Sequence, residues 1–75
     1  MSNRPKKRSL TLKGHRTSVS LEDDFWSALQ EIAAERSKAI NALAAEIDEA
    51  RPDDMGLASA MRLFILRHFR ERAGN

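Results

Sequence analysis

The chain has 75 residues, a net charge of +2 and no cysteine. A chain of this length makes one small domain, and the lack of cysteine excludes disulfides and thiolate metal sites as sources of stability. No apolar run approaches the roughly 18–20 residues of a membrane-spanning helix, and no signal-peptide apolar core follows the basic N-terminus. We therefore expect a cytoplasmic protein that oligomerises to bury enough apolar surface.

Positive charge is concentrated near the N-terminus. Residues 1–16 carry six basic residues and no acid, whereas residues 17–75 carry seven basic residues and eleven acids, a net charge of −4. A basic segment on a mildly acidic body favours a polyanion such as nucleic acid as partner. The alternative is a solvated tail that only aids solubility. The six basic residues are Arg4, Lys6, Lys7, Arg8, Lys13 and Arg16.

The N-terminal segment contains two kinds of sequence. Residues 1–8 combine a charge run with a proline and supply no core residue, which predicts a disordered basic arm before a domain at 9–75. Residues 9–13 alternate, with Leu10 and Leu12 on one side, and Gly14 allows a turn. A hairpin over 9–21 is therefore one interpretation. The alternative is an extended arm that docks only on a ligand.

Residues 16–21 alternate more clearly. Thr17, Val19 and Leu21 point one way, as in a strand with one buried face. The opposite, wet face would carry Arg16, Ser18 and Ser20. A lone short strand needs a partner, and we expect that partner to be its copy in a second subunit.

Helical spacing follows the strand. A first helix is predicted over about residues 21–36, since an acidic run marks its start. A second is predicted over about residues 39–50. The segment 51–56 contains Pro52 and Gly56 and should form a loop. The expected core of a homodimer consists of Val19, Leu21, Phe25, Leu29, Ile32, Ile40, Leu43 and Ile47.

A third helix, over about residues 57–72, is the most apolar segment. Leu63 and Leu66 broaden its apolar surface nearly all round, so the helix should be buried on more than one side. Burial in a dimer core is one interpretation, and docking of a second protein is the other. The main stripe consists of Leu57, Met61, Phe64, Ile65 and Phe69.

This order of elements predicts a mostly α protein with a short N-terminal β-ribbon. A two-stranded antiparallel ribbon fits the DNA major groove. Arg16, Ser18 and Ser20 would then contact base edges, because arginine can bind guanine through two hydrogen bonds and serine can donate or accept. Ser20 has a competing role as a helix cap.

The sequence resembles the ribbon-helix-helix family of DNA-binding proteins. The matching segments are Arg16–Trp26 (RTSVSLEDDFW), Leu29 with Ile32 and Ala33, and Ile40–Leu43 (INAL) with Ile47. Residues 57–64 also resemble a small bacterial subfamily with an additional C-terminal helix. The resemblance implies an intertwined homodimer, major-groove readout by the strands, and phosphate contact at the start of the second helix.

The sequence departs from the family between the two helices. Family members usually have a glycine and then a serine or threonine cap, where this chain has Ser37 and Ala39. A serine cap helps to orient the free N–H groups that bind phosphate, so the phosphate contact here would depend on Ser37 and Lys38. The predicted phosphate-contacting residues are Lys6, Lys7, Arg8, Lys13, Ser37 and Lys38.

Enzymatic chemistry finds little support in the sequence. His15 and His68 lie at opposite ends of the chain, and the carboxylates occur as adjacent pairs rather than as converging ones. We expect no cofactor and no metal. The predicted function is that of a sequence-specific DNA-binding repressor or autoregulator. The alternative is an antitoxin-like module that binds a partner protein through its third helix. A lipid-binding role would need an amphipathic anchor that residues 4–16 lack.

Overall fold

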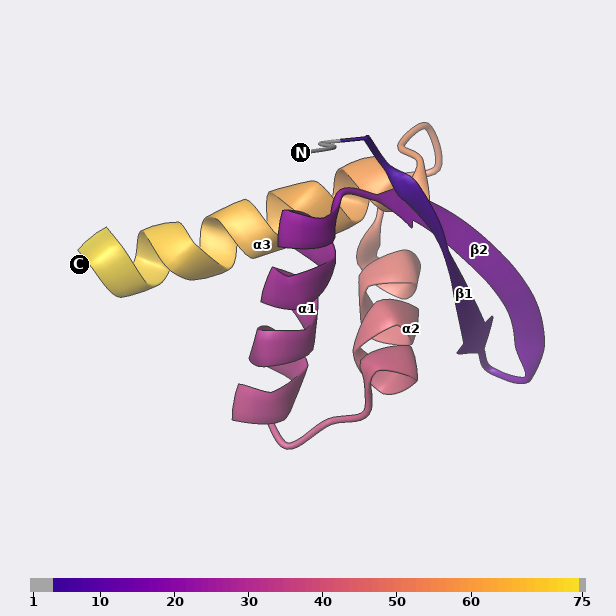
Figure 1. Ribbon diagram of the computed structural model, residues 1–75, viewed down its shortest axis with the longest axis horizontal. Coiled ribbons are helices and arrows are strands. Elements are labelled where there is room, and N and C mark those ends of the chain that lie inside the picture. Colours follow the sequence, from indigo (N-terminus) through magenta and orange to yellow (C-terminus); the bar gives the residue numbers. More distant parts are fainter. Residues whose placement is uncertain (1–3, 75) are drawn as a thin grey trace.

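The computed structural model describes residues 4–74 as a hairpin followed by three helices (Figure 1). Helices α1 and α2 lie side by side, α3 crosses one end of this pair, and the hairpin stands against α2. The mostly α fold with an N-terminal ribbon and a third helix confirms the predicted fold class. The elements are β1 (Lys6–Leu12), β2 (His15–Leu21), α1 (Asp23–Glu35), α2 (Ile40–Ala50) and α3 (Leu57–Gly74).

The hairpin joins β1 and β2 as an antiparallel pair through a two-residue turn. The turn residues Lys13 and Gly14 have φ angles of 52° and 82°, and two successive positive φ values are typical of the type I′ turn, whose twist matches that of paired strands. Hence β2 has a strand partner in its own chain. The premise that β2 lacks a partner strand within its own chain was wrong, because the turn at Gly14 brings Ser9–Leu12 back along β2.

The start of β1 corrects a second expectation. Lys6, Lys7 and Arg8 are strand residues, although the sequence placed them in a disordered arm over residues 1–8. Pairing with β2 provides their backbone hydrogen bonds, and contacts with α1 hold two of their side chains. Residues 1–3 of the predicted arm lie outside the described residues.

The helices lie close to their predicted bounds. Glu22, in an extended conformation, precedes α1, and no side chain caps this helix; Ser20 therefore does not serve as its cap. At the other end, Ser37 has a φ of 57°, and the N–H of Lys38 donates to the carbonyl of Ala33 at 2.9 Å. This is the left-handed helix ending that glycine favours, so Ser37 occupies a glycine-type position.

The core forms within a single chain. Val19, Leu21, Leu29, Ile32, Leu43 and Ile47 are buried as predicted, while Phe25 and Ile40 are partly buried against them. Leu10 adds a contribution from β1, and α3 adds its own buried residues. The buried residues of α3 are Ala60, Met61 and Ile65.

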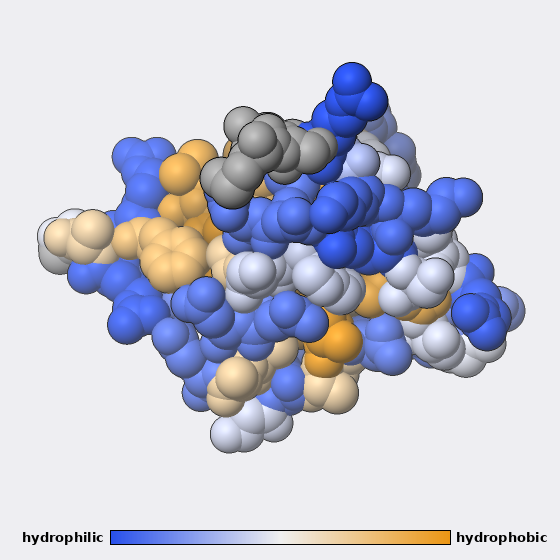
Figure 2. All heavy atoms as spheres, viewed as in Figure 1, coloured by the Kyte–Doolittle hydropathy of each residue, from blue (hydrophilic) through white to orange (hydrophobic). Residues whose placement is uncertain are grey.

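The apolar stripe of α3 is only partly covered. Leu57, Phe64 and Leu63 are half-buried, whereas Phe69 is 39% exposed and Leu66 is 50% exposed. Figure 2 shows hydrophobic surface over the part of α3 that extends beyond α1. Within the single chain Phe69 is left exposed, because the last turns of α3 run past the end of the helical pair. Among residues 4–74, no helix is long and apolar enough to cross a membrane.

Candidate nucleic-acid interface

The two faces of the hairpin differ in character. Residues directly opposite each other in an antiparallel pair share a face, and the register pairs Lys7 with Ser20, Ser9 with Ser18, and Thr11 with Arg16. All six side chains are exposed. They comprise two cations and four hydroxyl groups, without a carboxylate. We call this set the outer face: Lys7, Ser9, Thr11, Arg16, Ser18 and Ser20.

The inner face attaches the hairpin to the helices. Leu10 and Val19 are buried in the core and Leu12 packs against it, so the ribbon has a rigid support. At the end of β1, the N–H of Thr11 donates to Oδ1 of Asn41 in α2 at 3.1 Å. The start of α2 therefore lies beside the turn end of the hairpin, as Figure 1 shows.

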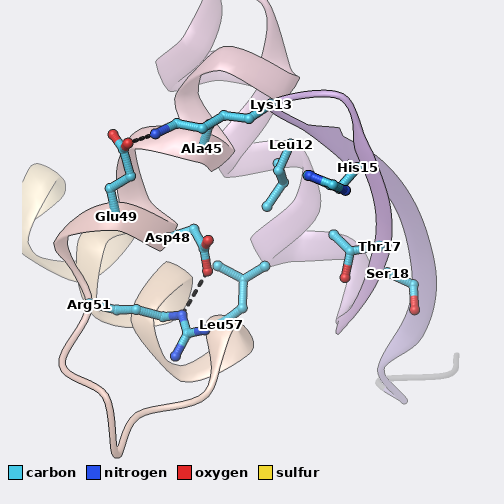
Figure 3. A pocket seen from close by; sticks show the side chains of 10 residues that line it. All are labelled: Leu12, Lys13, His15, Thr17, Ser18, Ala45, Asp48, Glu49, Arg51 and Leu57. Carbon is cyan, nitrogen blue, oxygen red and sulfur yellow. Dashed lines mark hydrogen bonds and ion pairs between the residues drawn. The ribbon is translucent and has the colours of Figure 1, made fainter.

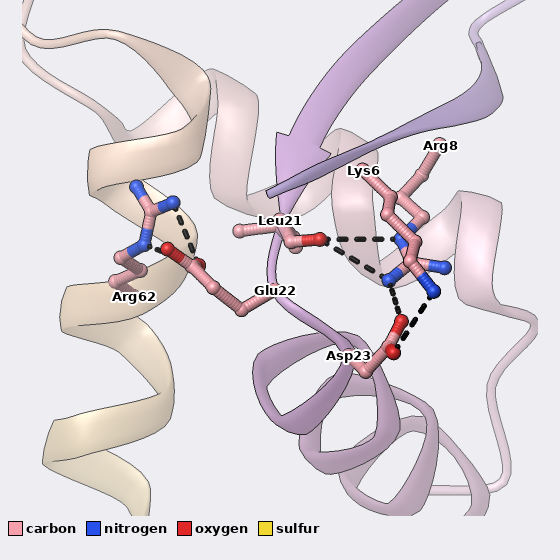
Figure 4. Close-up of polar contacts among 6 residues, drawn as sticks. All are labelled: Lys6, Arg8, Leu21, Glu22, Asp23 and Arg62. Carbon is pink, nitrogen blue, oxygen red and sulfur yellow. Dashed lines mark hydrogen bonds and ion pairs between the residues drawn. The ribbon is translucent and has the colours of Figure 1, made fainter. Parts of the chain in front are cut away.

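Lys6 and Arg8 also belong to the inner face, and both contact the start of α1 (Figure 4). Lys6 Nζ lies 3.1 Å from Asp23 Oδ2, and Arg8 Nη2 lies 2.5 Å from Asp23 Oδ1. Arg8 also donates to the Leu21 carbonyl and stacks over the Trp26 ring, 5.5 Å from its centroid. We call Lys6, Arg8 and Asp23 the Asp23 cluster. Its two cations hold the ribbon against α1.

A second polar contact joins α3 to the end of β2. Arg62 donates to the Glu22 carboxylate at 2.8 Å and to the Ser20 carbonyl at 3.4 Å. Its guanidinium also lies over the Phe25 ring. The third helix is thereby tied to the segment between ribbon and α1, so the orientation of the ribbon depends on all three helices.

Two acidic residues at the start of α1, Glu22 and Asp23, have lowered pKa values. The hydrogen bond from Arg62 is the main cause of the lowered pKa of Glu22. For Asp23, the hydrogen bond from Arg8 comes first and that from Lys6 second in lowering its pKa. Both carboxylates stay ionised at neutral pH, and Asp23 neutralises two cations, Lys6 and Arg8, that the sequence assigned to phosphate.

The remaining predicted phosphate contacts lie near the turn and the start of α2. Lys13 pairs with Glu49, and Lys38 pairs with Glu46. All four of these side chains are substantially exposed, and such pairs contribute little and open readily. Ser37 is exposed, and α2 begins at Ile40, after Ala39, without a side-chain cap. Lys13 thus lies in the hairpin turn, and Ser37 and Lys38 lie in the connection between α1 and α2.

A hollow lies between β2 and the end of α2 (Figure 3). Its volume is about 410 Å³. His15 and Thr17 point into it from the inner face of β2, yet both remain exposed because no helix covers this half of the ribbon. Two ion pairs, Lys13–Glu49 and Arg51–Asp48, border it. The other lining residues are Leu12, Ser18, Ala45 and Leu57.

The sequence missed two residues of the outer face, Ser9 and Thr11. Arg16, Ser18 and Ser20 lie together on β2 as predicted by their alternation, whereas Ser9 and Thr11 were not assigned a contact. The signal that could have found them is the alternation of residues 9–13 followed by Gly14. Of the three basic residues predicted at the start of the chain, only Lys7 faces outward with the β2 set.

The described residues contain no group of three or more His, Asp or Glu side chains that could hold a metal ion. The two histidines are far apart in the fold: His15 borders the hollow, and His68 lies 3.4 Å from a carboxylate oxygen of Glu35 between α3 and α1.

Comparison with known proteins gives one match. Residues 5–69 match the family model described as a ribbon-helix-helix domain. That range includes the hairpin, α1, α2 and most of α3. Searches of curated proteins and of solved structures found no significant match.

Proposed function

Because the chain belongs to the ribbon-helix-helix family, whose members are typically DNA-binding regulators of transcription, we propose that it is a sequence-specific repressor or autoregulator. Its two-stranded ribbon enters the major groove, which has room for such a ribbon. The observation that carries this proposal is the outer face, where Arg16, Ser18 and Ser20 stand exposed on a strand anchored by buried Val19 and Leu21.

The chemistry of this face suits base edges. The guanidinium of Arg16 can donate two hydrogen bonds to the O6 and N7 atoms of one guanine. The hydroxyls of Ser18 and Ser20 can each donate or accept, so they fit more than one base. The side chain of Arg16 forms no hydrogen bond or ion pair with another residue in the described part of the chain, so its binding to DNA breaks no side-chain contact within the protein.

Phosphate contacts come from the residues around this face. Lys7 lies on the outer face itself. Lys13 and Lys38 can exchange their exposed carboxylate partners for phosphates at little cost. Lys6 and Arg8 have a structural role in the Asp23 cluster, so we expect them to contribute less to DNA affinity than the sequence suggested. Ser37 lies beside the free N–H groups at the start of α2, which favour anions.

The test is selection of bound sequences from random duplexes at physiological salt, followed by titration. Arg16→Ala should weaken binding to the selected sequence by about 1–3 kcal/mol and relax the preference at one base position. Arg70→Ala, which removes an exposed arginine from α3, is the matched control and should keep the consensus. If wild-type protein selected no consensus, the proposed function would be wrong.

We also propose a homodimer, since the family generally forms dimers. Leu66 and Phe69 leave apolar area exposed on α3, and contiguous exposed apolar area often marks an interaction site. Two copies that met through this surface would leave both ribbons free. Sedimentation at micromolar concentration should give a dimer, and Leu66→Glu should give a folded monomer. A monomeric wild-type protein would contradict this arrangement.

A second candidate function is binding of a different protein through α3, as in an antitoxin. The supporting observation is an apolar hollow of about 280 Å³ between α3 and the end of α2, lined in part by Met55, Leu63 and Phe64. Replacing Leu63 and Leu66 together with Glu separates the candidates. A partner-binding surface predicts a folded variant that still binds DNA and no longer copurifies with one stoichiometric protein. Unchanged copurification would exclude this surface.

A further inference from the structure

The hollow of about 280 Å³ between α3 and the end of α2 has apolar walls. They come from the last turn of α2, from the loop 51–56 and from residues 60–67 of α3. Ile47 and Ala60 are buried, whereas Met55, Leu63 and Phe64 are only partly covered. Apolar surface in this hollow therefore remains accessible to a ligand.

Two arginines, Arg51 and Arg67, complete the lining, and among the described residues no carboxylate lines the hollow. Arg51 is held in place, because its Nε donates to Asp48 Oδ1 at 2.7 Å and its Nη1 donates to the Met55 carbonyl at 2.7 Å. These contacts leave its Nη2 available to a ligand. Arg67 is exposed, and its side chain forms no hydrogen bond or ion pair with another described residue. The hollow thus combines apolar walls with positive charge that has no complete counterion.

Lining and size together define the class of ligand. Apolar walls favour an apolar body, and a guanidinium group binds a carboxylate through paired, charge-assisted hydrogen bonds. The volume lies just below the range of about 300–1,000 Å³ that is typical of sites for drug-sized molecules, so a single ring or a short branched chain suits it. A docking protein would bury about 800 Å² on each side, and the exposed Leu66 and Phe69 do not line the hollow.

We infer that this hollow binds a small organic acid with an apolar body, such as an arylalkyl or branched-alkyl carboxylate. The apolar body packs against Leu63 and Phe64, and the carboxylate accepts hydrogen bonds from Arg67 and Arg51. The inference does not rest on the proposed DNA-binding function, because no residue of the outer face lines the hollow. The same hollow supports the second candidate function, so the test must distinguish a small acid from a protein.

The experiment titrates the full chain with phenylacetate at millimolar concentration. Backbone amide shifts in two-dimensional NMR should concentrate in residues 47–55 and 60–67 and leave the hairpin unchanged. In calorimetry, Arg67→Gln should weaken binding roughly 5- to 20-fold, because it removes a charge-assisted hydrogen bond at a partly exposed position. Arg70→Gln alters another exposed arginine of α3 that does not line the hollow. This control should bind phenylacetate as the wild-type protein does.

Two further probes separate the apolar and the ionic contributions. Phenylacetamide keeps the ring without the charge, and acetate keeps the charge without the ring. Each should bind at least about 10-fold more weakly than phenylacetate, since each lacks one of the two interactions. Equal binding of phenylacetate and phenylacetamide would overturn the inference, because the arginines would then have no part in recognition.

Absence of localised shifts with phenylacetate would also overturn the inference, and Arg67→Gln then identifies what covers the hollow instead. A dimer that becomes a folded monomer in sedimentation would make the hollow an interface between two copies of the chain. Loss of one stoichiometric copurifying protein, with self-association unchanged, would make it the protein-binding surface of the second candidate function.

Discussion

Arg8 has three different contacts, and they make it a structural residue. Its guanidinium donates to the Leu21 carbonyl and the Asp23 carboxylate and lies over the Trp26 ring. The side chain is only 16% exposed. Because these contacts occupy the guanidinium, Arg8 should affect DNA binding only indirectly. It holds β1, the strand that carries part of the outer face, in position.

Arg8→Ala should therefore destabilise the protein by about 1–3 kcal/mol, because hydrogen bonds from a charged donor contribute about that much and the stacking on Trp26 is lost as well. Urea denaturation measures this change. Lys7→Ala, one residue away on the solvent side, should leave the unfolding midpoint unchanged and reduce only DNA affinity. Equal destabilisation by both variants would contradict the assignment of faces.

Ser37 is the other residue whose conformation has a measurable cost. A non-glycine residue in the left-handed region pays about 1–2 kcal/mol, and the φ of Ser37 is 57°. Ser37→Gly should raise the free energy of unfolding by about 0.5–1 kcal/mol, since the greater freedom of glycine in the unfolded chain offsets part of the gain. Thermal denaturation shows whether Ser37→Gly raises or lowers the stability of the protein. Ser27→Gly, in the middle of α1, should be destabilising by about 0.5 kcal/mol.

Among the elements, α3 combines a buried part and an exposed part. Its first half lies across α1 and α2, and its second half extends beyond them (Figure 1). Met61 is fully buried while Leu66 is half exposed. The helix thus completes the core with its first half and leaves apolar side chains exposed on its second half.

A pair of substitutions within α3 tests this division. Met61→Ala should cost about 2–5 kcal/mol, as expected for truncation of a buried side chain in a packed core. Leu66→Ala should change stability by less than about 0.5 kcal/mol, like other surface substitutions. Both values come from chemical denaturation at a protein concentration low enough to keep the chain monomeric. A large cost for Leu66→Ala under these conditions would place that side chain in the core.

The elements also show what could be predicted from the sequence. Hydrophobic periodicity located all three helices, because each buries one stripe on its neighbours. The alternation of Arg16–Leu21 located β2 and its solvent face. The strand β1 was missed in its first half, because charge at residues 6–8 is typical of disorder. The neutralising partner, Asp23, is 15 residues from Arg8, and local patterns carry no information on such distant contacts.

The outer face could be predicted only in part for a related reason. Which β1 residue stands beside Arg16 depends on register, and register depends on the turn type. A two-residue turn at Lys13–Gly14 places Thr11 there. Strand alternation turns Lys6 and Arg8, which the sequence assigned to phosphate, toward the helices, where both contact Asp23.

At the scale of the whole molecule, ion pairs join the ribbon to α1 and α1 to α3. Asp23 pairs with the ribbon, and Glu22, directly before α1, pairs with Arg62 of α3. Both have lowered pKa values in the folded protein, so the unfolded chain binds more protons in the acidic range. Stability should consequently be complete above the ordinary carboxyl pKa of about 4 and should fall as the pH is lowered further.

This pH dependence can be measured from urea midpoints at pH 7 and pH 3. The drop should be smaller for Glu22→Gln and for Asp23→Asn than for wild-type protein, because each variant removes one proton-linked contact. Glu31→Gln alters an exposed carboxylate on α1 that has no ion pair among the described residues. The Glu31→Gln variant should show the same decrease in urea midpoint between pH 7 and pH 3 as the wild-type protein. An identical pH dependence for all four proteins would contradict the proposal that Glu22 and Asp23 cause the loss of stability at low pH.

The Asp23 cluster has a further consequence for how DNA binding responds to salt. Added salt weakens binding by competing for phosphates, and it also screens exposed ion pairs such as Lys6–Asp23, which position β1. Ionic strength therefore has two effects. It weakens the contacts with DNA phosphates, and it weakens the ion pair that positions β1. We expect plots of log affinity against log salt to steepen at high salt, so that a slope measured there overstates the number of phosphates contacted.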